Sequence, residues 1–103
     1  MIDINDIREA RIKLLSEDRK EQILVNIKNQ LLYNGYARID GAAHYGNKEW
    51  NFPAMDEKHQ YQPICYAPFK FHPAIAEWLN RLGFHTSRYY NKGGVDNGLK
   101  VWI

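Results

Sequence analysis

The fold is decided in residues 71–83, which read FHPAIAEWLNRLG. Their apolar side chains recur at intervals of three and four residues, the spacing of one helix face: Ile75, Trp78, Leu79 and Leu82. Pro73 suits the first turn of a helix, where no backbone N–H is needed, and Gly83 suits the position just after the end. The stretch therefore predicts a helix with one buried face and a glycine cap.

Downstream of this helix, residues 84–90 and 99–103 resemble strands and flank the glycine-rich residues 91–98. Such an arrangement predicts an antiparallel hairpin, with Phe84, Leu99 and Val101 facing the core. The connection NKGGVDNG could also surround a phosphate with backbone N–H groups. It has neither a Walker pattern nor a following helix, so we interpret it as a hairpin turn whose glycines supply positive φ.

Upstream, residues 4–15 and 21–33 both place apolar side chains at helical spacing. These are Ile4, Ile7, Leu14 and Leu15 in the first run, and Ile23, Leu24, Ile27, Leu31 and Leu32 in the second. Asp18 and Glu21 resemble a capping box for the second helix, and Gly35 predicts its left-handed end. Residues 36–40 then alternate, which predicts a strand with Ala37 and Ile39 facing inward.

Between these parts lie residues 41–60, which show no regular period but contain the rings Tyr45, Trp50 and Phe52. A loop of this length in a small domain is typically functional. Residues 61–71 are apolar, but two prolines restrict them to an edge strand or an extended segment. The order predicts an α+β fold in a single domain, 1–103: an antiparallel sheet of three to four strands, with an N-terminal helical pair and one further helix packed on one face.

Composition excludes several classes of protein. Of 103 residues, 45% are hydrophobic and 25% charged, as in ordinary globular domains, which argues against disorder and collagen. A single cysteine, Cys65, excludes an internal disulfide. Because the N-terminus carries early acids and no run approaches ~18 apolar residues, we expect neither a secretory signal nor a membrane span. These features predict a cytoplasmic protein.

The titratable side chains give no clear catalytic or metal-binding pattern. No two of His44, His59, Cys65, His72 and His85 lie closer than six residues, whereas zinc ligands typically come in closer pairs. Cys65 and His72 could form a thiolate and base, but the apolar neighbours of Cys65 favour a packed cysteine. Hydrolysis through converging histidines is a further alternative. The sequence thus predicts no catalytic residues, no metal and no cofactor.

Rings and cations are concentrated near the C-terminus. Aromatic residues make up 14% of the chain, and residues 60–103 carry five bases against two acids. On a two-residue period Arg88 and Tyr90 share one strand face, as do Lys100 and Trp102. Alternating rings and cations are typical of sheets that bind single-stranded nucleic acid by stacking and phosphate contact.

The C-terminal third also resembles a known layout. It runs from Pro73 through Leu79 to Gly83 and Phe84, and closes with Val101-Trp102-Ile103 after a glycine turn. This pattern is similar to that of small uncharacterised accessory proteins of tailed bacteriophages, over about 31 of the 103 residues. The resemblance implies a protein that binds host components or small signal molecules without chemistry of its own, in the host cytosol if it is phage-encoded.

Together these patterns predict a non-catalytic binding or inhibitory module that engages a host protein or an anionic small molecule. We expect the contacts in residues 41–60 and in the C-terminal hairpin, since aromatic and arginine side chains dominate interface energetics. The predicted contact residues are Tyr45, Trp50, Phe52, Arg88, Tyr89, Tyr90 and Lys92. The alternative is a single-stranded nucleic-acid-binding protein that uses the basic and aromatic sheet face. Exposed rings on an end strand also make a homodimer an open alternative.

Overall fold

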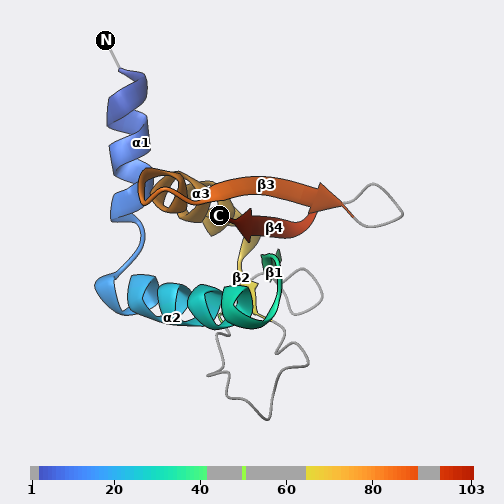
Figure 1. The fold of residues 1–103 in the computed structure, drawn as a ribbon. Coiled ribbons are helices and arrows are strands. Elements are labelled where there is room, and N and C mark those ends of the chain that lie inside the picture. The colour runs from blue at the N-terminus through green and yellow to red at the C-terminus, as the bar shows by residue number, and fades with distance from the viewer. Residues whose placement is uncertain (1–2, 42–49, 51–64, 91–95) are drawn as a thin grey trace.

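The protein is represented by a computed structural model that describes residues 3–41, 50, 65–90 and 96–103. Within these ranges three α-helices, one short 3₁₀ helix and four strands follow one another (Figure 1). The elements are α1 (Ile4–Lys13), α2 (Glu17–Tyr33), β1 (Ala37–Gly41), β2 (Tyr66–Ala67), η3 (Phe69–Phe71), α3 (His72–Arg81), β3 (His85–Tyr90) and β4 (Asp96–Trp102). The fold is therefore α+β, with the predicted N-terminal pair and one further helix.

The four strands form one sheet in the order β2-β1-β4-β3. Strand β4 is antiparallel to both neighbours, as the hairpin pattern predicted, with Val101 opposite Ala37 and Thr86. Strand β2 instead runs parallel to β1, pairing Tyr66 with Asp40. Parallel neighbours need a connection of a dozen or more residues, and residues 42–65 provide that length. The sheet is therefore mixed at this edge.

Helix α3 lies within one residue of its predicted position, because Pro73 and Gly83 fix its two ends. Pro73 occupies the first turn. At the other end Gly83 adopts φ of 105°, and the N–H groups of Gly83 and Phe84 donate to the carbonyls of Asn80 and Leu79 at 3.1 and 3.0 Å. This pair of bonds is a Schellman motif. It turns the chain directly from α3 into β3.

Helix α2 begins differently from the prediction. Its N-cap is Ser16, whose side chain accepts a hydrogen bond from the N–H of Arg19 at 3.2 Å. The capping box expected at Asp18 and Glu21 was therefore placed two residues too late. The helix ends at Tyr33 as expected, but through Asn34 in an extended conformation and without a left-handed Gly35.

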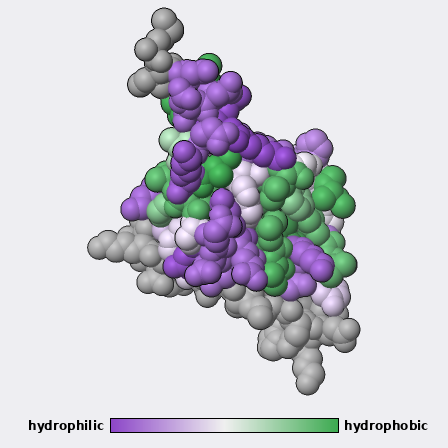
Figure 2. Space-filling view, turned by 90° about the vertical axis from the view of Figure 1, so that its left-hand side faces the viewer, coloured by the Kyte–Doolittle hydropathy of each residue, from purple (hydrophilic) through white to green (hydrophobic). Residues whose placement is uncertain are grey.

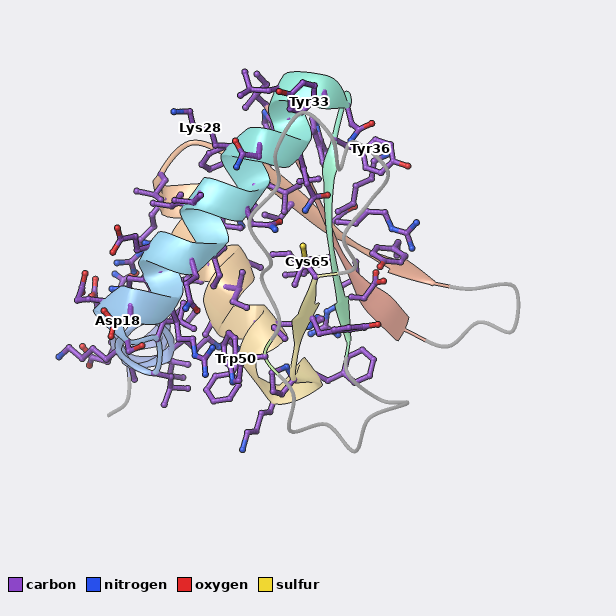
Figure 3. The ribbon with its side chains drawn as sticks, turned by 90° about the horizontal axis from the view of Figure 1, so that it is seen from below. Asp18, Lys28, Tyr33, Tyr36, Trp50 and Cys65 are labelled. Carbon is purple, nitrogen blue, oxygen red and sulfur yellow. The ribbon has the colours of Figure 1, made fainter. Side chains whose placement is uncertain are left out.

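The core lies between α2, α3 and one face of the sheet (Figure 3). Ile23 and Ile27 from α2 meet Ile75 and Leu79 from α3, and all four side chains are fully buried. Opposite them lie the strand residues Ala37, Ile39, Leu99 and Val101, all buried as predicted. One residue of each expected stripe in α2 and α3 does not join this core, because Leu32 is 66% exposed and Leu82 is 51% exposed.

Helix α1 lies outside the core and contains no buried residue. Ile4, Ile7 and Leu14, expected on a buried face, are exposed, and only Leu15 just beyond the helix is buried. Salt bridges from Arg8 to Glu77, at 3.2 Å, and from Arg81 to Glu9 join α1 to α3. Figure 2 shows the projecting α1 end of the molecule with a mainly hydrophilic surface.

A buried polar cluster supports β1 where β2 does not reach it. The Gln30 side chain accepts from the N–H of Arg38 at 2.9 Å and donates to the carbonyl of the same residue at 3.1 Å. It also donates to Oδ1 of Asn26 at 2.7 Å. The Gln30 amide thereby replaces a missing strand neighbour, which satisfies backbone groups that burial would otherwise penalise.

Candidate functional site

The two faces of the sheet carry different side chains. One face packs on the helices. The other, which we call the open face, presents alternate residues of three strands and the residue before β1. With described side chains it comprises Tyr36, Arg38, Asp40, His85, Ser87, Tyr89, Lys100 and Trp102. The strand pairing assigns them to one face, since His85 lies opposite Trp102, Ser87 opposite Lys100, and Arg38 also opposite Lys100. Figure 3 shows Tyr36 on the side of β1 away from α2.

Two cations on the open face lie over two tyrosine rings. The guanidinium carbon of Arg38 is 4.7 Å from the centroid of the Tyr89 ring, and its Nη2 donates to the Tyr89 hydroxyl at 3.3 Å. The Lys100 ammonium is 4.6 Å from the centroid of the Tyr36 ring. Distances below 6 Å are typical of cation–π attraction. The pairs hold positive charge beside flat rings across β3, β4 and β1.

A third ring pair extends this surface along the hairpin. The rings of His85 and Trp102 stack with centroids 5.6 Å apart and planes inclined by 24°. His85 is exposed, while Trp102 is half-buried. Ring systems stacked in this way are held by their neighbours and need little reordering when a further flat group binds.

Asp40 is the acidic member of the open face. Its Oδ1 lies 3.5 Å from Nη2 of Arg38 but accepts no hydrogen bond within the described part of the chain. Burial raises the pKa of this carboxyl, and the charge of Arg38 opposes that effect. The carboxylate therefore partly offsets the positive charge of the face without cancelling it.

The structure separates the predicted contact residues. Tyr89 lies on the open face with Lys100 and Trp102, whereas Arg88 points to the helix side, opposite Leu99 in the register. The expectation that Arg88 shares a sheet surface with Lys100 and Trp102 is therefore wrong, because neighbouring residues of a strand point to opposite faces. Tyr45, Phe52, Lys92 and the side chain of Tyr90 lie outside the described residues.

Trp50, the remaining predicted contact, packs against the protein itself. Its ring lies 4.9 Å from that of Phe71, and the guanidinium carbon of Arg19 is 4.7 Å from its centroid. The side chain is half-buried at the edge of the core. These contacts fix the position of Trp50 near the start of α2, as Figure 3 shows, and away from the open face.

In the two cation–ring pairs of the open face, Tyr36 and Arg38 were not predicted from the sequence as part of this surface. The alternation of residues 36–40 had already placed Arg38 away from the core. The missing signal was the pairing of β1 with β4, a contact between segments about 60 residues apart. Local periodicity cannot supply such a pairing.

Cys65 is part of the core and not of a reactive site. Its thiol donates to Oδ1 of Asn26 at 2.8 Å, and burial raises the thiol pKa to about 12. His72, the residue considered as its base, is buried too, and Nε2 donates to the carbonyl of Ala67 at 2.8 Å. A nucleophilic cysteine needs a lowered pKa, so these surroundings support the packed interpretation.

The described residues contain no group of three histidine, cysteine or carboxylate side chains placed to hold a metal ion. Nor does any helix among them have both the length and the apolar character needed to cross a bilayer. No protein-family model, curated protein or solved structure shows a significant match to this chain.

Proposed function

We propose that this protein is a non-catalytic binding module and that single-stranded nucleic acid binds the open face of its sheet. The observation that carries the proposal is the arrangement of rings and cations there, above all Arg38 over Tyr89 and Lys100 over Tyr36. Bases stack on flat side chains whatever their sequence, and cations beside the rings contact the phosphates between bases.

The chemistry of the face favours this ligand over an apolar one. Arg38 and Lys100 are both accessible and lie on adjacent strands, where Asp40 provides the opposing charge. Ring and cation alternate across three strands, so a bound strand could place successive bases and phosphates on matching groups. An apolar helix or peptide would instead need the cations to lose their hydration without a partner, which costs free energy.

The rings are also suited to bind without large reordering. Tyr89 is held by the Arg38 hydrogen bond, and Trp102 is held by the stack with His85. A base could then stack on the faces of these rings that Arg38 and His85 do not cover. Pre-ordered side chains lose less entropy on binding than free ones.

The test is fluorescence anisotropy of labelled single-stranded DNA and RNA 12-mers with the full chain, repeated over a range of salt concentrations. We expect affinity to fall steeply with salt, because phosphate contacts release counterions. Arg38→Gln and Lys100→Gln should each lower the salt slope by about 1. Tyr89→Ala should weaken binding at every salt concentration, by roughly fivefold or more for a lost stacked base.

Lys28→Gln is the matched control. Lys28 is an exposed cation on α2, on the helix side of the molecule, so the substitution removes the same charge from another surface (Figure 3). Equal losses in Lys28→Gln and Arg38→Gln would show that only net charge matters and would refute the open face as the site. Absence of binding to any 12-mer at low salt would refute the function itself.

Phage origin, an inhibitory role and the engagement of a host protein stay predictions from the sequence. A protein partner would also use arginine and aromatic anchors. The salt titration separates the two classes, since a protein interface of this composition depends on salt far less than a row of phosphates does.

A further inference from the structure

A cleft of about 460 Å³ opens between α1, α3 and β3, on the helix side of the sheet. Pockets for small molecules typically occupy on the order of 300–1,000 Å³. It is lined by residues of α1, α3 and β3 and by Leu99 of β4. Figure 1 shows the lower end of α1 beside α3 and the start of β3. The cleft is therefore large enough for a metabolite, and its arginine side chains are separate from those of the open face.

Three arginines from two distant parts of the chain converge on this cleft: Arg8 and Arg11 from α1, and Arg88 from β3. Glu77 is the acidic residue among the lining side chains, so the formal balance is three positive charges against one. Arginine binds phosphate oxygens through paired, parallel N–H donors. This charge pattern favours a ligand with more than one negative charge.

The Glu77 carboxylate leaves part of the Arg8 guanidinium available to a ligand. Arg8 uses Nε to contact Glu77 at 3.2 Å, and half of the Arg8 side chain remains exposed. A guanidinium has five N–H donors, so one such contact leaves others for a ligand.

Neutral polar groups line the same cleft and suit the rest of an organic ligand. Thr86 donates its hydroxyl to Oδ1 of Asn80 at 2.9 Å, and both residues line the cleft. Pro73, Ala76 and Leu99 give the cleft an apolar part. Charged, polar and apolar contacts in one cleft are typical of sites for small organic molecules.

We infer that this cleft binds a small molecule that carries a phosphate or pyrophosphate group. The inference goes beyond the proposed function, because it concerns another surface and another ligand. Arg88, predicted from the sequence as a contact for an anion, takes that role here together with Arg8 and Arg11.

The experiment is titration of the ¹⁵N-labelled full chain with sodium pyrophosphate and, separately, with adenosine diphosphate, followed by NMR. We expect the amide signals of Thr86, Ser87 and Arg88 to shift with both ligands. Arg11→Gln and Arg88→Gln should each weaken binding roughly tenfold, as for a lost charge-assisted hydrogen bond. Lys13→Gln removes an exposed charge of α1 outside the cleft and should leave the affinity unchanged.

Glu77→Gln should change the affinity for pyrophosphate in the opposite direction. Removing the competing carboxylate should strengthen binding severalfold, whereas a variant that merely damaged the fold would weaken it. Adding the single-stranded 12-mer should leave pyrophosphate bound, since the two ligands use different sides of the sheet. Displacement of pyrophosphate by the 12-mer, equal losses in Lys13→Gln, or weaker binding by Glu77→Gln would each overturn the inference.

Discussion

Neighbouring residues of β1 illustrate the difference between the two faces of the sheet. Ile39 is fully buried against the helices, while Arg38 is 41% exposed and lies over the Tyr89 ring. The same alternation separates Val101 from Lys100 on β4. One face thus contributes the packing that stabilises the fold, and the other contributes groups suited to recognition. The comparison implies that substitutions one position apart should have unrelated consequences.

We expect the largest loss of stability at Gly98, where β4 approaches β1 closely and both faces of the sheet depend on that pairing. A Cβ at Gly98 would overlap the carbonyl oxygen of Ile39, and Gly98 has φ of 154°. Gly98→Ala should therefore separate β4 from β1 and lower the free energy of unfolding by about 4 kcal/mol or more, through overpacking and backbone strain together. Urea unfolding followed by circular dichroism measures it.

Gly35→Ala is the control for that substitution. No atom lies within 4 Å of a Cβ at Gly35, and its φ is not positive. The variant should be as stable as the parent protein or slightly more stable, since alanine reduces the entropy of the unfolded chain. A comparable loss of stability in both variants would contradict the role assigned to Gly98.

Ile39→Ala tests the helix-covered face alone. The fully buried side chain leaves a cavity in the core, so the free energy of unfolding should fall by about 3 kcal/mol. Oligonucleotide affinity of the folded fraction should be unchanged. Arg38→Gln, one residue away, should show the reverse: nearly unchanged stability and weaker binding. If Ile39→Ala and Arg38→Gln each lowered both the stability and the oligonucleotide affinity, the two faces would not have separate roles.

Gln30→Leu probes the support of β1 from the helix side. The substitution leaves the N–H and carbonyl of Arg38 without the Gln30 amide, and the free energy of unfolding should fall by about 2 kcal/mol. Gln22→Leu, the same change at an exposed position of α2, should alter it by less than about 0.5 kcal/mol. Thermal unfolding of the two variants side by side provides the measurement.

The smallest effect concerns the carboxyl on the open face. Because burial raises the pKa of Asp40 above its ordinary value of 3.8, the folded state holds the proton more tightly than the unfolded state does. The Asp40 contribution to stability is therefore greatest below that value and declines as pH rises through the folded pKa. Asp40→Asn should remove this decline, a change of about 0.5 kcal/mol. Urea unfolding of both proteins between pH 3 and 7 would reveal it, and parallel profiles would contradict it.

The helices and strands were largely predictable because each has a local signal. Pro73 and Gly83 bound α3, and alternation in residues 36–40 gave β1 its inward face. The apolar spacing of α1 was misleading, since Ile4 and Ile7 satisfy a helical period but meet no partner within the described residues that buries them. Periodicity reports which side chains share a face, and it carries no information on whether another element covers that face.

The candidate site was predictable only in part. The concentration of rings and cations in the hairpin pointed to Tyr89, Lys100 and Trp102, but the phase of β3 was wrong by one residue. His85–Tyr90 contains polar and aromatic residues without a strict alternation. Its phase is set by the pairing with β4, and Arg88 consequently faces the cleft. The three-arginine cleft unites α1 with β3, positions about 80 residues apart that no local pattern connects.

The Gln30 amide has a consequence for how molecules of this protein behave at high concentration. Strand β2 spans only two residues, so part of the β1 edge would otherwise expose a free donor and acceptor to an extended segment of another chain. A side chain from α2 occupies both groups and blocks intermolecular strand addition there. Among the residues that the structure describes, one buried amide thus occupies the two backbone groups that a strand from another molecule would need at this edge.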